Sequence, residues 1–173
     1  MTGRPAVEVR VDDLAFYEGD AVARPSTARL AALTPVIRRL ELAAGPRLLD
    51  RLHVHEPLPV GSAVVTGAGD LPAELMIHGV IQSETETVTR DGVRRALRSV
   101  LQRAVDWQLR SIGIAPFGLG AGNLDVEDSA QALADALEAH VARAATFPVA
   151  ITIVTETADE ADIFRHCMSY RSL

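Results

Sequence analysis

The sequence predicts an α/β fold in which helices cover both faces of one sheet. Its second half alternates apolar strand-like runs with long stretches of helical period, which is typical of βα-layered proteins. The runs at 63–66 and 75–81 are almost continuously apolar, as in strands that are covered on both sides. With 173 residues, 48% of them hydrophobic, the chain is long enough for a single domain spanning 1–173, with its core at about 7–165.

Local signals mark the limits of the expected elements. Residues 7–11 alternate apolar and charged side chains, the period of a half-buried strand. Thr34 is a candidate N-cap before Pro35, and Gly45 follows that helix. Asp125 is the expected cap of a later helix. The expected strands are 7–11, 21–23, 63–66, 75–81, 111–115 and 150–155; the expected helices are 35–44, 93–105, one from Asp125 to about 141, and 160–168, with a short helical turn near 48–52.

Composition and charge exclude several classes of protein. The single Cys167 cannot form an internal disulfide, which argues against a disulfide-framed secreted module. The apolar runs fall short of the ~18 residues of a membrane span, and the N-terminus lacks a signal-peptide core. A net charge of −6 and few aromatic residues argue against nucleic-acid binding. We therefore expect a cytoplasmic protein that has neither a membrane nor a nucleic-acid partner.

A glycine-rich loop at 118–124 is the strongest local signal of a binding site. Gly118, Gly120 and Gly122 occupy alternate positions between an expected strand and a capped helix. This spacing can turn successive backbone N–H groups to one side, where they would hold a phosphate. Asn123 stands where a GxGxxG dinucleotide fingerprint needs its third glycine, and the Gly-Lys pair of a Walker loop is missing. The residues alone leave open whether the loop is a phosphate site or a plain tight turn.

Other polar residues carry weaker signals of chemistry. His53 and His55 lie on the same side of an extended segment, as two metal ligands would, but the sequence places no third ligand near them. We expect His78, inside an apolar strand, to be a hydrogen-bonded core histidine, and Cys167 to be an inert packed thiol. No serine has a GxSxG context. The sequence thus indicates no catalytic residue, no metal site and no cofactor.

Two blocks of the sequence, separated by an expected helix, carry a family pattern. The first is GSAVVTGAGDLPAELMIHGVI (61–81), and the second is SIGIAPFGLGAGNLDVEDSA (111–130). A fainter match is VRVDDLAFYEGDAV (9–22). In order and spacing these blocks resemble the macro domain family, whose members bind ADP-ribose and related nucleotides. The resemblance implies a three-layer α/β/α sandwich with a mixed central sheet and a cleft for ADP-ribose at the strand ends.

The resemblance also implies a set of ligand-binding residues. Asp13 matches the acid that binds the adenine amino group, and Leu14 matches the residue whose backbone contacts the base. One loop of the family wraps the pyrophosphate and the distal ribose. Its positions in this chain are Gly118, Leu119, Gly120, Ala121, Gly122 and Asn123.

The opposite half of the family's site is replaced in this chain. Where the family has an NaAN motif that contacts the distal ribose, this chain has Arg24-Pro25-Ser26-Thr27. The glycines of the family's next loop are replaced by 31–36, in which Pro35 has no N–H to donate. We expect Arg24 to offset part of this loss by pairing with a phosphate.

The base end of the site differs as well. Asp12 replaces a family glycine and adds a negative charge beside an anionic ligand. The aromatic residue that often stacks on adenine has no match near Glu156.

Three functions from different classes fit these features. The first is a divergent macro domain that binds an ADP-ribose-related nucleotide, or another phosphate-bearing ligand, weakly and without catalysis. The second is an ADP-ribosyl hydrolase, and the third is a ligand-free fold that serves as a protein–protein interaction module. The missing asparagines favour the first function over the second, because hydrolysis needs an oriented water or ribose. The surviving glycine loop favours the first over the third.

Overall fold

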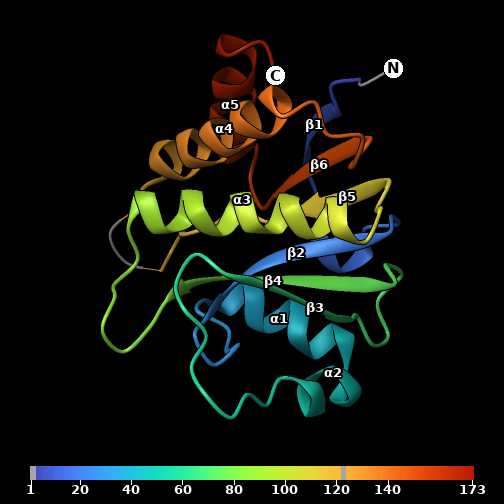
Figure 1. Cartoon of the computed structure of the whole chain (residues 1–173), viewed down its shortest axis with the longest axis vertical. Helices are drawn as coiled ribbons and strands as arrows, with labels where there is room; N and C mark the ends of the chain where they lie inside the picture. The colour runs from blue at the N-terminus through green and yellow to red at the C-terminus, as the bar shows by residue number, and fades with distance from the viewer. Residues whose placement is uncertain (1–2, 122–123) are drawn as a thin grey trace.

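The computed structural model describes residues 3–121 and 124–173, which form one α/β unit (Figure 1). The strands are β1 (Ala6–Val11), β2 (Ala21–Thr27), β3 (Ala63–Gly67), β4 (Leu75–Gln82), β5 (Ser111–Ile114) and β6 (Ala150–Thr155). The helices are α1 (Pro35–Ala44), α2 (Pro46–Arg51), α3 (Arg90–Asp106), α4 (Val126–Ala142) and α5 (Ala158–Tyr170), with a short 3-10 helix, η1 (Leu14–Phe16).

The strands form one six-stranded sheet in the order β1-β6-β5-β2-β4-β3. Neighbouring strands run parallel, except for β3, which pairs antiparallel with β4. The sheet is therefore mixed, as expected. Strand β1 lies at one edge of the sheet, beside β6 (Figure 1).

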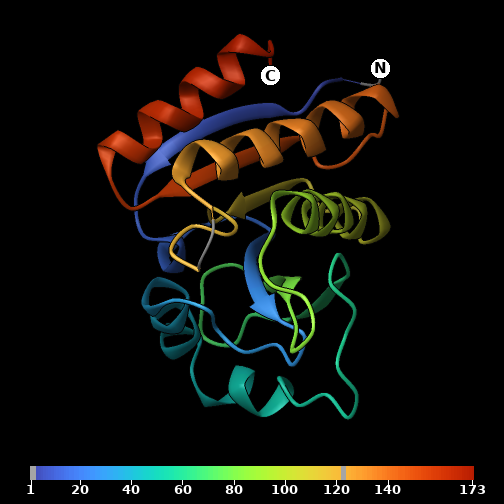
Figure 2. The same ribbon diagram turned by 90° about the vertical axis from the view of Figure 1, so that its left-hand side faces the viewer.

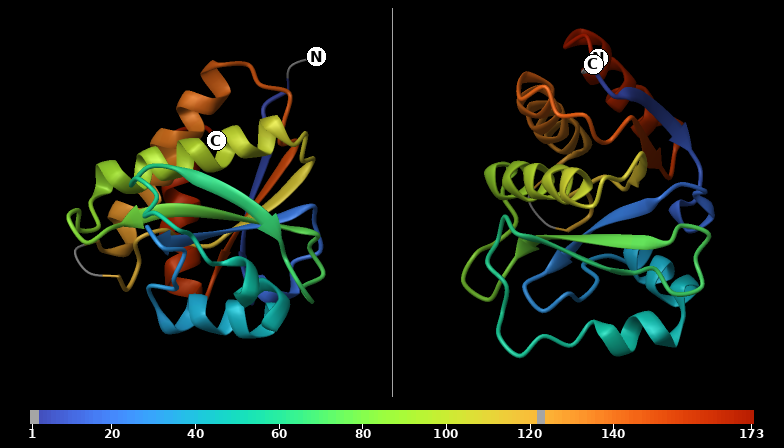
Figure 3. Two further views of the ribbon diagram at one scale, coloured as in Figure 1. Left: turned by 60° about the horizontal axis from the view of Figure 1, so that its bottom comes forward. Right: turned by 45° about the vertical axis from the view of Figure 1, so that its right-hand side comes forward.

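Helices cover both faces of the sheet and give the expected three layers. On one face α3, α4 and α5 contribute to one apolar core, in which Leu97, Leu133 and Phe164 are buried together. On the other face α1 and α2 form a second core around Leu40 and Leu48. Figure 2 and the right panel of Figure 3 show α1 and α3 on opposite sides of β2. None of the helices in the described ranges has the length and apolarity of a membrane-spanning segment.

Several local predictions are confirmed. The Thr34 side chain caps α1 by accepting a hydrogen bond from Ile37 N at 3.3 Å, and Gly45 ends this helix with a φ of 85°. Asp125 caps α4 in the same way, with Asp128 N as the donor at 2.8 Å. The apolar run at 75–81 is strand β4, buried from Met76 onward.

Strand β2 is longer than the expected 21–23, because it continues through Arg24-Pro25-Ser26-Thr27. Proline is normally kept out of central strands, because it cannot donate to a neighbouring strand. Here β2 pairs with β5 only over 21–23, and Ala115 N donates to Ala23 O at the end of that ladder. Backbone groups two residues apart point to the same side of a strand. The nitrogen of Pro25, which carries no hydrogen, therefore faces the region beyond the end of β5. In the described ranges β5 does not pair with β2 there, so a backbone donor is not required at this position.

Candidate functional site

A cavity of about 330 Å³ opens beyond the carboxyl ends of β2 and β5. One wall comes from the segment after β5, and the opposite wall comes from the end of β2 and the start of α1. Glu156, in the loop after β6, and Glu160, in the first turn of α5, contribute two carboxylates to its lining. The lining residues are Pro25, Leu33, Thr34, Pro35, Val36, Ile37, Ala115, Pro116, Gly118, Leu119, Gly120, Ala121, Glu156 and Glu160.

The glycine-rich loop forms the first wall as a sequence of turns. Gly118 has a φ of 85° and Gly120 a φ of 75°, the left-handed region that side chains with a Cβ rarely adopt. A Cβ at Gly118 would also come within 2.7 Å of Leu124 Cδ1, so that position requires glycine. The predicted residues 118–121 therefore lie together at the cavity. Gly122 and Asn123, predicted as part of the same loop, lie outside the described residues.

The facing wall consists of side chains at the start of α1. Thr34 comes close to the glycine loop, because its Cγ2 lies 3.6 Å from the position of a Cβ on Gly120. The Thr34 hydroxyl already accepts the hydrogen bond from Ile37 N, and Pro35 has no N–H. This wall therefore presents methyl groups and a proline ring where a second glycine loop would present backbone donors.

Arg24 does not reach this cavity, so the prediction that it pairs with a phosphate is wrong. Its side chain is fully buried beneath α1. Nη1 donates to Glu41 Oε1 at 2.6 Å, Nη2 to Leu30 O at 2.7 Å, and Nε to His78 Nδ1 at 2.8 Å. Burial lowers the pKa of Arg24 and the Glu41 carboxylate opposes this effect. A fully buried guanidinium that donates to three internal acceptors cannot reach a ligand in the cavity.

His78 extends the Arg24 network across the sheet. Because the Arg24 Nε can only donate, His78 Nδ1 is the acceptor and its Nε2 carries the proton. Nε2 then donates to Thr66 Oγ1 at 2.8 Å, and that hydroxyl donates to Gly67 O at 3.0 Å. Burial, followed by the Arg24 charge, lowers the pKa of His78 well below its ordinary value of 6.5. His78 is therefore the neutral, hydrogen-bonded core histidine that the sequence predicts.

The predicted base-binding residues lie at a second, smaller compartment of about 30 Å³. Asp13 caps η1 by accepting a hydrogen bond from Ala15 N at 2.9 Å, and Leu14 is buried behind it. The two compartments share five lining residues and so form one continuous cleft. The shared residues are Val36, Ile37, Ala115, Pro116 and Glu156.

The charged residues that line the described part of the cleft are all acidic. Asp12 and Asp13 border the small compartment, Glu160 borders the large one, and Glu156 borders both. Arg39 on α1 does not line either compartment, but its Nη2 lies 2.9 Å from Glu156 Oε1. No pattern in the sequence links Arg39 to Glu156, because the two residues are 117 positions apart.

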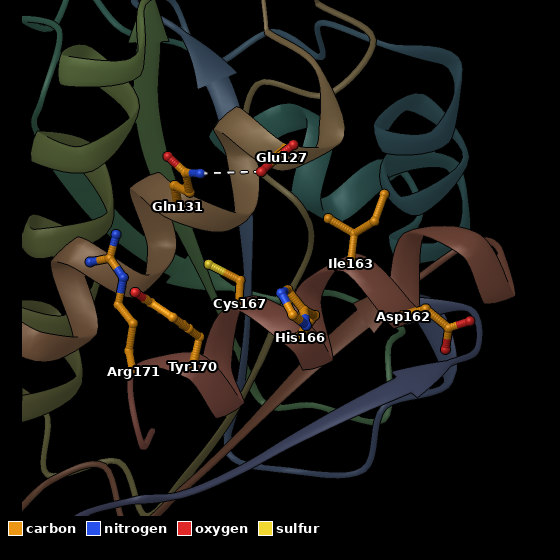
Figure 4. A pocket seen from close by; sticks show the side chains of 8 residues that line it. All are labelled: Glu127, Gln131, Asp162, Ile163, His166, Cys167, Tyr170 and Arg171. Atoms are coloured by element: carbon orange, nitrogen blue, oxygen red, sulfur yellow. Dashed lines mark hydrogen bonds between the residues drawn. The ribbon is translucent and has the colours of Figure 1, made fainter.

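Two other predicted features lie away from the cleft. His53 and His55 are in the connection between α2 and β3, and within 3–121 and 124–173 no group of three or more His, Cys, Asp or Glu side chains is arranged to hold a metal ion. His166 and Cys167 line a hollow of about 540 Å³ between α4 and α5 (Figure 4). Cys167 is only partly buried, packed against the main core, and burial raises the pKa of its thiol.

Comparison with known proteins places the chain in a family. The family model described as "Macro domain" matches residues 27–133. This chain belongs to the macro domain family. The matched range includes α1 and the glycine loop, whereas Asp12, Asp13 and Glu156 at the smaller compartment lie outside it.

The relatives of this macro domain differ in length and in what is known of them. An uncharacterized protein of Mycobacterium tuberculosis is 28% identical over 134 residues, which cover 78% of this chain and 37% of the relative. The chain thus spans little more than a third of the length of that protein. An O-acetyl-ADP-ribose deacetylase of Klebsiella pneumoniae is 29% identical over 130 residues, covering 72% of this chain and 74% of the enzyme.

Solved structures confirm the fold. The macrodomain of Oceanobacillus iheyensis in a structure with ADP superimposes with a TM-score of 0.83. The alignment covers 98% of this chain and 93% of that one, at 19% identity.

Proposed function

We propose that this macro domain binds an ADP-ribose-related nucleotide, or another phosphate-bearing ligand, weakly and without catalysis. The observation that carries the proposal is the glycine loop. Gly118 and Gly120 hold left-handed turns at the rim of a cavity of about 330 Å³, a geometry that lets backbone N–H groups converge on an anion. The similar macrodomain of O. iheyensis, seen with ADP, supports a nucleotide diphosphate as the class of ligand.

Binding is weak because only one wall offers backbone donors. Each hydrogen bond to a charged group contributes about 1.5–3 kcal/mol, and the α1 wall replaces such donors with Thr34, Pro35 and Leu33. The carboxylates of Glu156 and Glu160 at the rim add repulsion toward a phosphate. The Arg24 charge cannot compensate, because its guanidinium is buried beneath the cleft.

Catalysis is absent because the side chains at the positions of the family's asparagines serve the fold. Arg24 is held by Glu41, His78 and the Leu30 carbonyl. Thr27 Oγ1 accepts hydrogen bonds from Ala31 N at 3.0 Å and from Arg29 N at 3.3 Å, which closes the turn after β2. Neither side chain is free to orient a ribose or a water molecule, so hydrolysis has no positioning group here.

Calorimetry with ADP-ribose, together with a turnover assay on O-acetyl-ADP-ribose and on an ADP-ribosylated protein, tests this function. We expect a dissociation constant for ADP-ribose no tighter than about 100 µM. The loss of two charge-assisted hydrogen bonds lowers the affinity by more than about a hundredfold. We expect no turnover above the uncatalysed rate. A low-micromolar dissociation constant, or turnover that the Gly120→Ala variant abolishes, would contradict the proposal.

A further inference from the structure

We propose that Arg47 and Arg51 of α2, together with the turn after β3, form a second anion site that takes a phosphate group, free or as a small monoester. The cavity between them has a volume of about 190 Å³. Its lining residues are Arg47, Leu48, Arg51, Gly67, Ala68, Gly69 and Glu74. The inference goes beyond the proposed function, because it involves neither the glycine loop nor the α1 wall.

The cavity lies at the opposite end of the sheet from the cleft. The cleft opens beyond the carboxyl ends of β2 and β5, whereas the turn after β3 leads into the amino end of β4, which runs parallel to β2. The two cavities have no lining residue in common. Binding at one can therefore be measured separately from binding at the other.

Two arginines supply the positive charge of the cavity. Arg47 and Arg51 are four positions apart in α2, a spacing that brings two side chains to the same side of a helix. Both residues are exposed. Within 3–121 and 124–173, neither guanidinium has a carboxylate oxygen within 4.0 Å or donates a hydrogen bond to the protein. Both are therefore available to an anion, to which arginine can donate two parallel hydrogen bonds.

The end of β3 lies against one of these arginines and turns a backbone donor outward. Arg51 Nη1 is 3.4 Å from the position of a Cβ on Gly67, so the guanidinium lies close to the backbone there. Ala68 N donates to Glu74 O at 3.0 Å, toward the β4 side. Successive N–H groups of a strand point to opposite sides, so the Gly67 N–H points to the free edge of the sheet, where β3 is the last strand described.

The next turn supplies a second backbone donor. Gly69 has a φ of 62°, and a Cβ at this position would come within 2.2 Å of Ala44 O, so the turn requires glycine. Asp70 N donates to the same carbonyl at 2.8 Å, which fixes the turn against the end of α1. In the described part of the chain the Gly69 N–H has no acceptor. Two backbone donors and two guanidiniums thus border one cavity, a combination that suits an oxyanion.

The size and the charge of the cavity indicate the class of ligand. Its volume of about 190 Å³ is below the roughly 300 Å³ at which small-molecule sites begin, yet several times the ~30 Å³ that a water molecule takes up in the liquid. This size suits a single phosphate group rather than a nucleotide. Glu74 also lines the cavity and opposes an anion, but two arginines against one glutamate leave an excess of one positive charge.

Titration with inorganic phosphate, followed by NMR at the glycine amides, tests the inference. Gly67 and Gly69 report on this cavity, and Gly118 and Gly120 report on the cleft. At low ionic strength, where charges are little screened, phosphate should shift the Gly67 and Gly69 resonances. We expect a dissociation constant of about 1 mM, equivalent to about 4 kcal/mol. Methyl phosphate distinguishes the two sources of the group, because an unchanged affinity assigns a small monoester and a loss of binding assigns the free ion.

Three substitutions change the charge of the cavity in known directions. Arg47→Gln and Arg51→Gln should each weaken phosphate binding about tenfold, equivalent to about 1.4 kcal/mol. Glu74→Gln should strengthen it about threefold, because it removes the opposing carboxylate. All three residues are exposed, so the variants should keep the fold.

Two matched controls remove a charge of each sign elsewhere. Arg98→Gln on α3 and Asp159→Asn on α5 change exposed residues of helices on the other face of the sheet. Both should leave phosphate binding at Gly67 and Gly69 unchanged. Arg98→Gln that weakens binding as much as Arg47→Gln would assign the effect to net charge and overturn the inference.

The pattern of shifted resonances separates this inference from the proposed function. Saturable shifts at Gly118 and Gly120, without any at Gly67 and Gly69, would overturn the second site and leave the cleft as the anion site. Shifts at Gly67 and Gly69 alone would support the second site and leave the proposed function to its own test with ADP-ribose. The absence of shifts at all four glycines would overturn the second site as well.

Discussion

The wall formed by 115–121 and the wall formed by β2 and the start of α1 face each other across the cleft and differ in what lines them. The first presents backbone, because glycines at 118 and 120 hold conformations that other residues avoid. The second presents side chains, and its charged residue Arg24 turns away from the cleft into the protein. One wall is therefore mainly backbone, in which Ala121 N already donates to Gly118 O at 3.4 Å, whereas the charged side chain of the other wall is committed to contacts inside the protein.

The features that mark the family and the features that would decide which ligand binds lie in different parts of this domain. The glycine wall keeps the geometry that suits an anion, and the sheet beneath both walls keeps the family fold. The α1 wall has exchanged ligand contacts for an interior network that joins Arg24, Glu41 and His78. The replacement of the side chains in the α1 wall has thus left the architecture intact.

The largest expected effect concerns the interior network. Arg24→Met leaves Glu41 buried without its partner, and breaking a buried pair in this way costs about 3–5 kcal/mol. Urea unfolding should show this loss in the free energy of unfolding. Arg39→Met is the matched control, because it breaks an exposed ion pair that also involves a residue of α1. It should lower the free energy of unfolding by at most about 1 kcal/mol. Equal losses for the two variants would show that the Arg24 network does not hold the wall.

The second effect concerns the glycine wall. Gly120→Ala forces a side-chain-bearing residue to a φ of 75°, at a cost of about 1–2 kcal/mol. Space for the methyl group exists, since the nearest atom would be 3.6 Å away, so the fold should survive while the loop changes shape. Titration by calorimetry should show about tenfold weaker binding of ADP-ribose. The control Gly3→Ala has no atom within 4 Å of the new methyl group and should bind like the wild-type protein.

The smallest effect is a dependence of stability on pH that arises from His78. Its pKa is lowered in the folded protein, so the unfolded chain binds more protons below its ordinary pKa of 6.5. The contribution of neutral His78 is complete above about pH 6.5 and declines as the pH falls toward the folded pKa, by at most about 1.4 kcal/mol per pH unit. Urea unfolding across this range should give a smaller slope for His78→Gln. The exposed His55→Gln should keep the wild-type slope, and a wild-type slope in His78→Gln would contradict the assignment.

The fold was predictable from the sequence because its signals are local. The continuous apolar run of β4, the cap of α1 at Thr34 and the cap of α4 at Asp125 each depend on neighbouring residues, and the structure confirms all three. The core role of His78 followed from its place in an apolar strand, and its partners fit that role.

The α1 wall was harder to predict, because its contacts join residues far apart in the sequence. Arg24 meets His78 across 54 positions, and no periodicity links them. The chain Arg24-Pro25-Ser26-Thr27 has none of the apolar pattern of a strand, yet it is buried between two layers. The Arg39–Glu156 pair spans 117 positions and has the same cause. Such pairs become visible only when the fold brings their elements together.

The cleft itself follows from the path of the chain around two neighbouring strands. Strands β2 and β5 are adjacent, but the connection from β2 leads to α1 on one face, whereas the connection from β5 leads to α4 on the other. Such a topological switch point leaves a crevice at the carboxyl ends of the strands, whichever side chains border it. The hollow is therefore inherited with the connectivity, and only its lining has to change for one class of ligand to be exchanged for another.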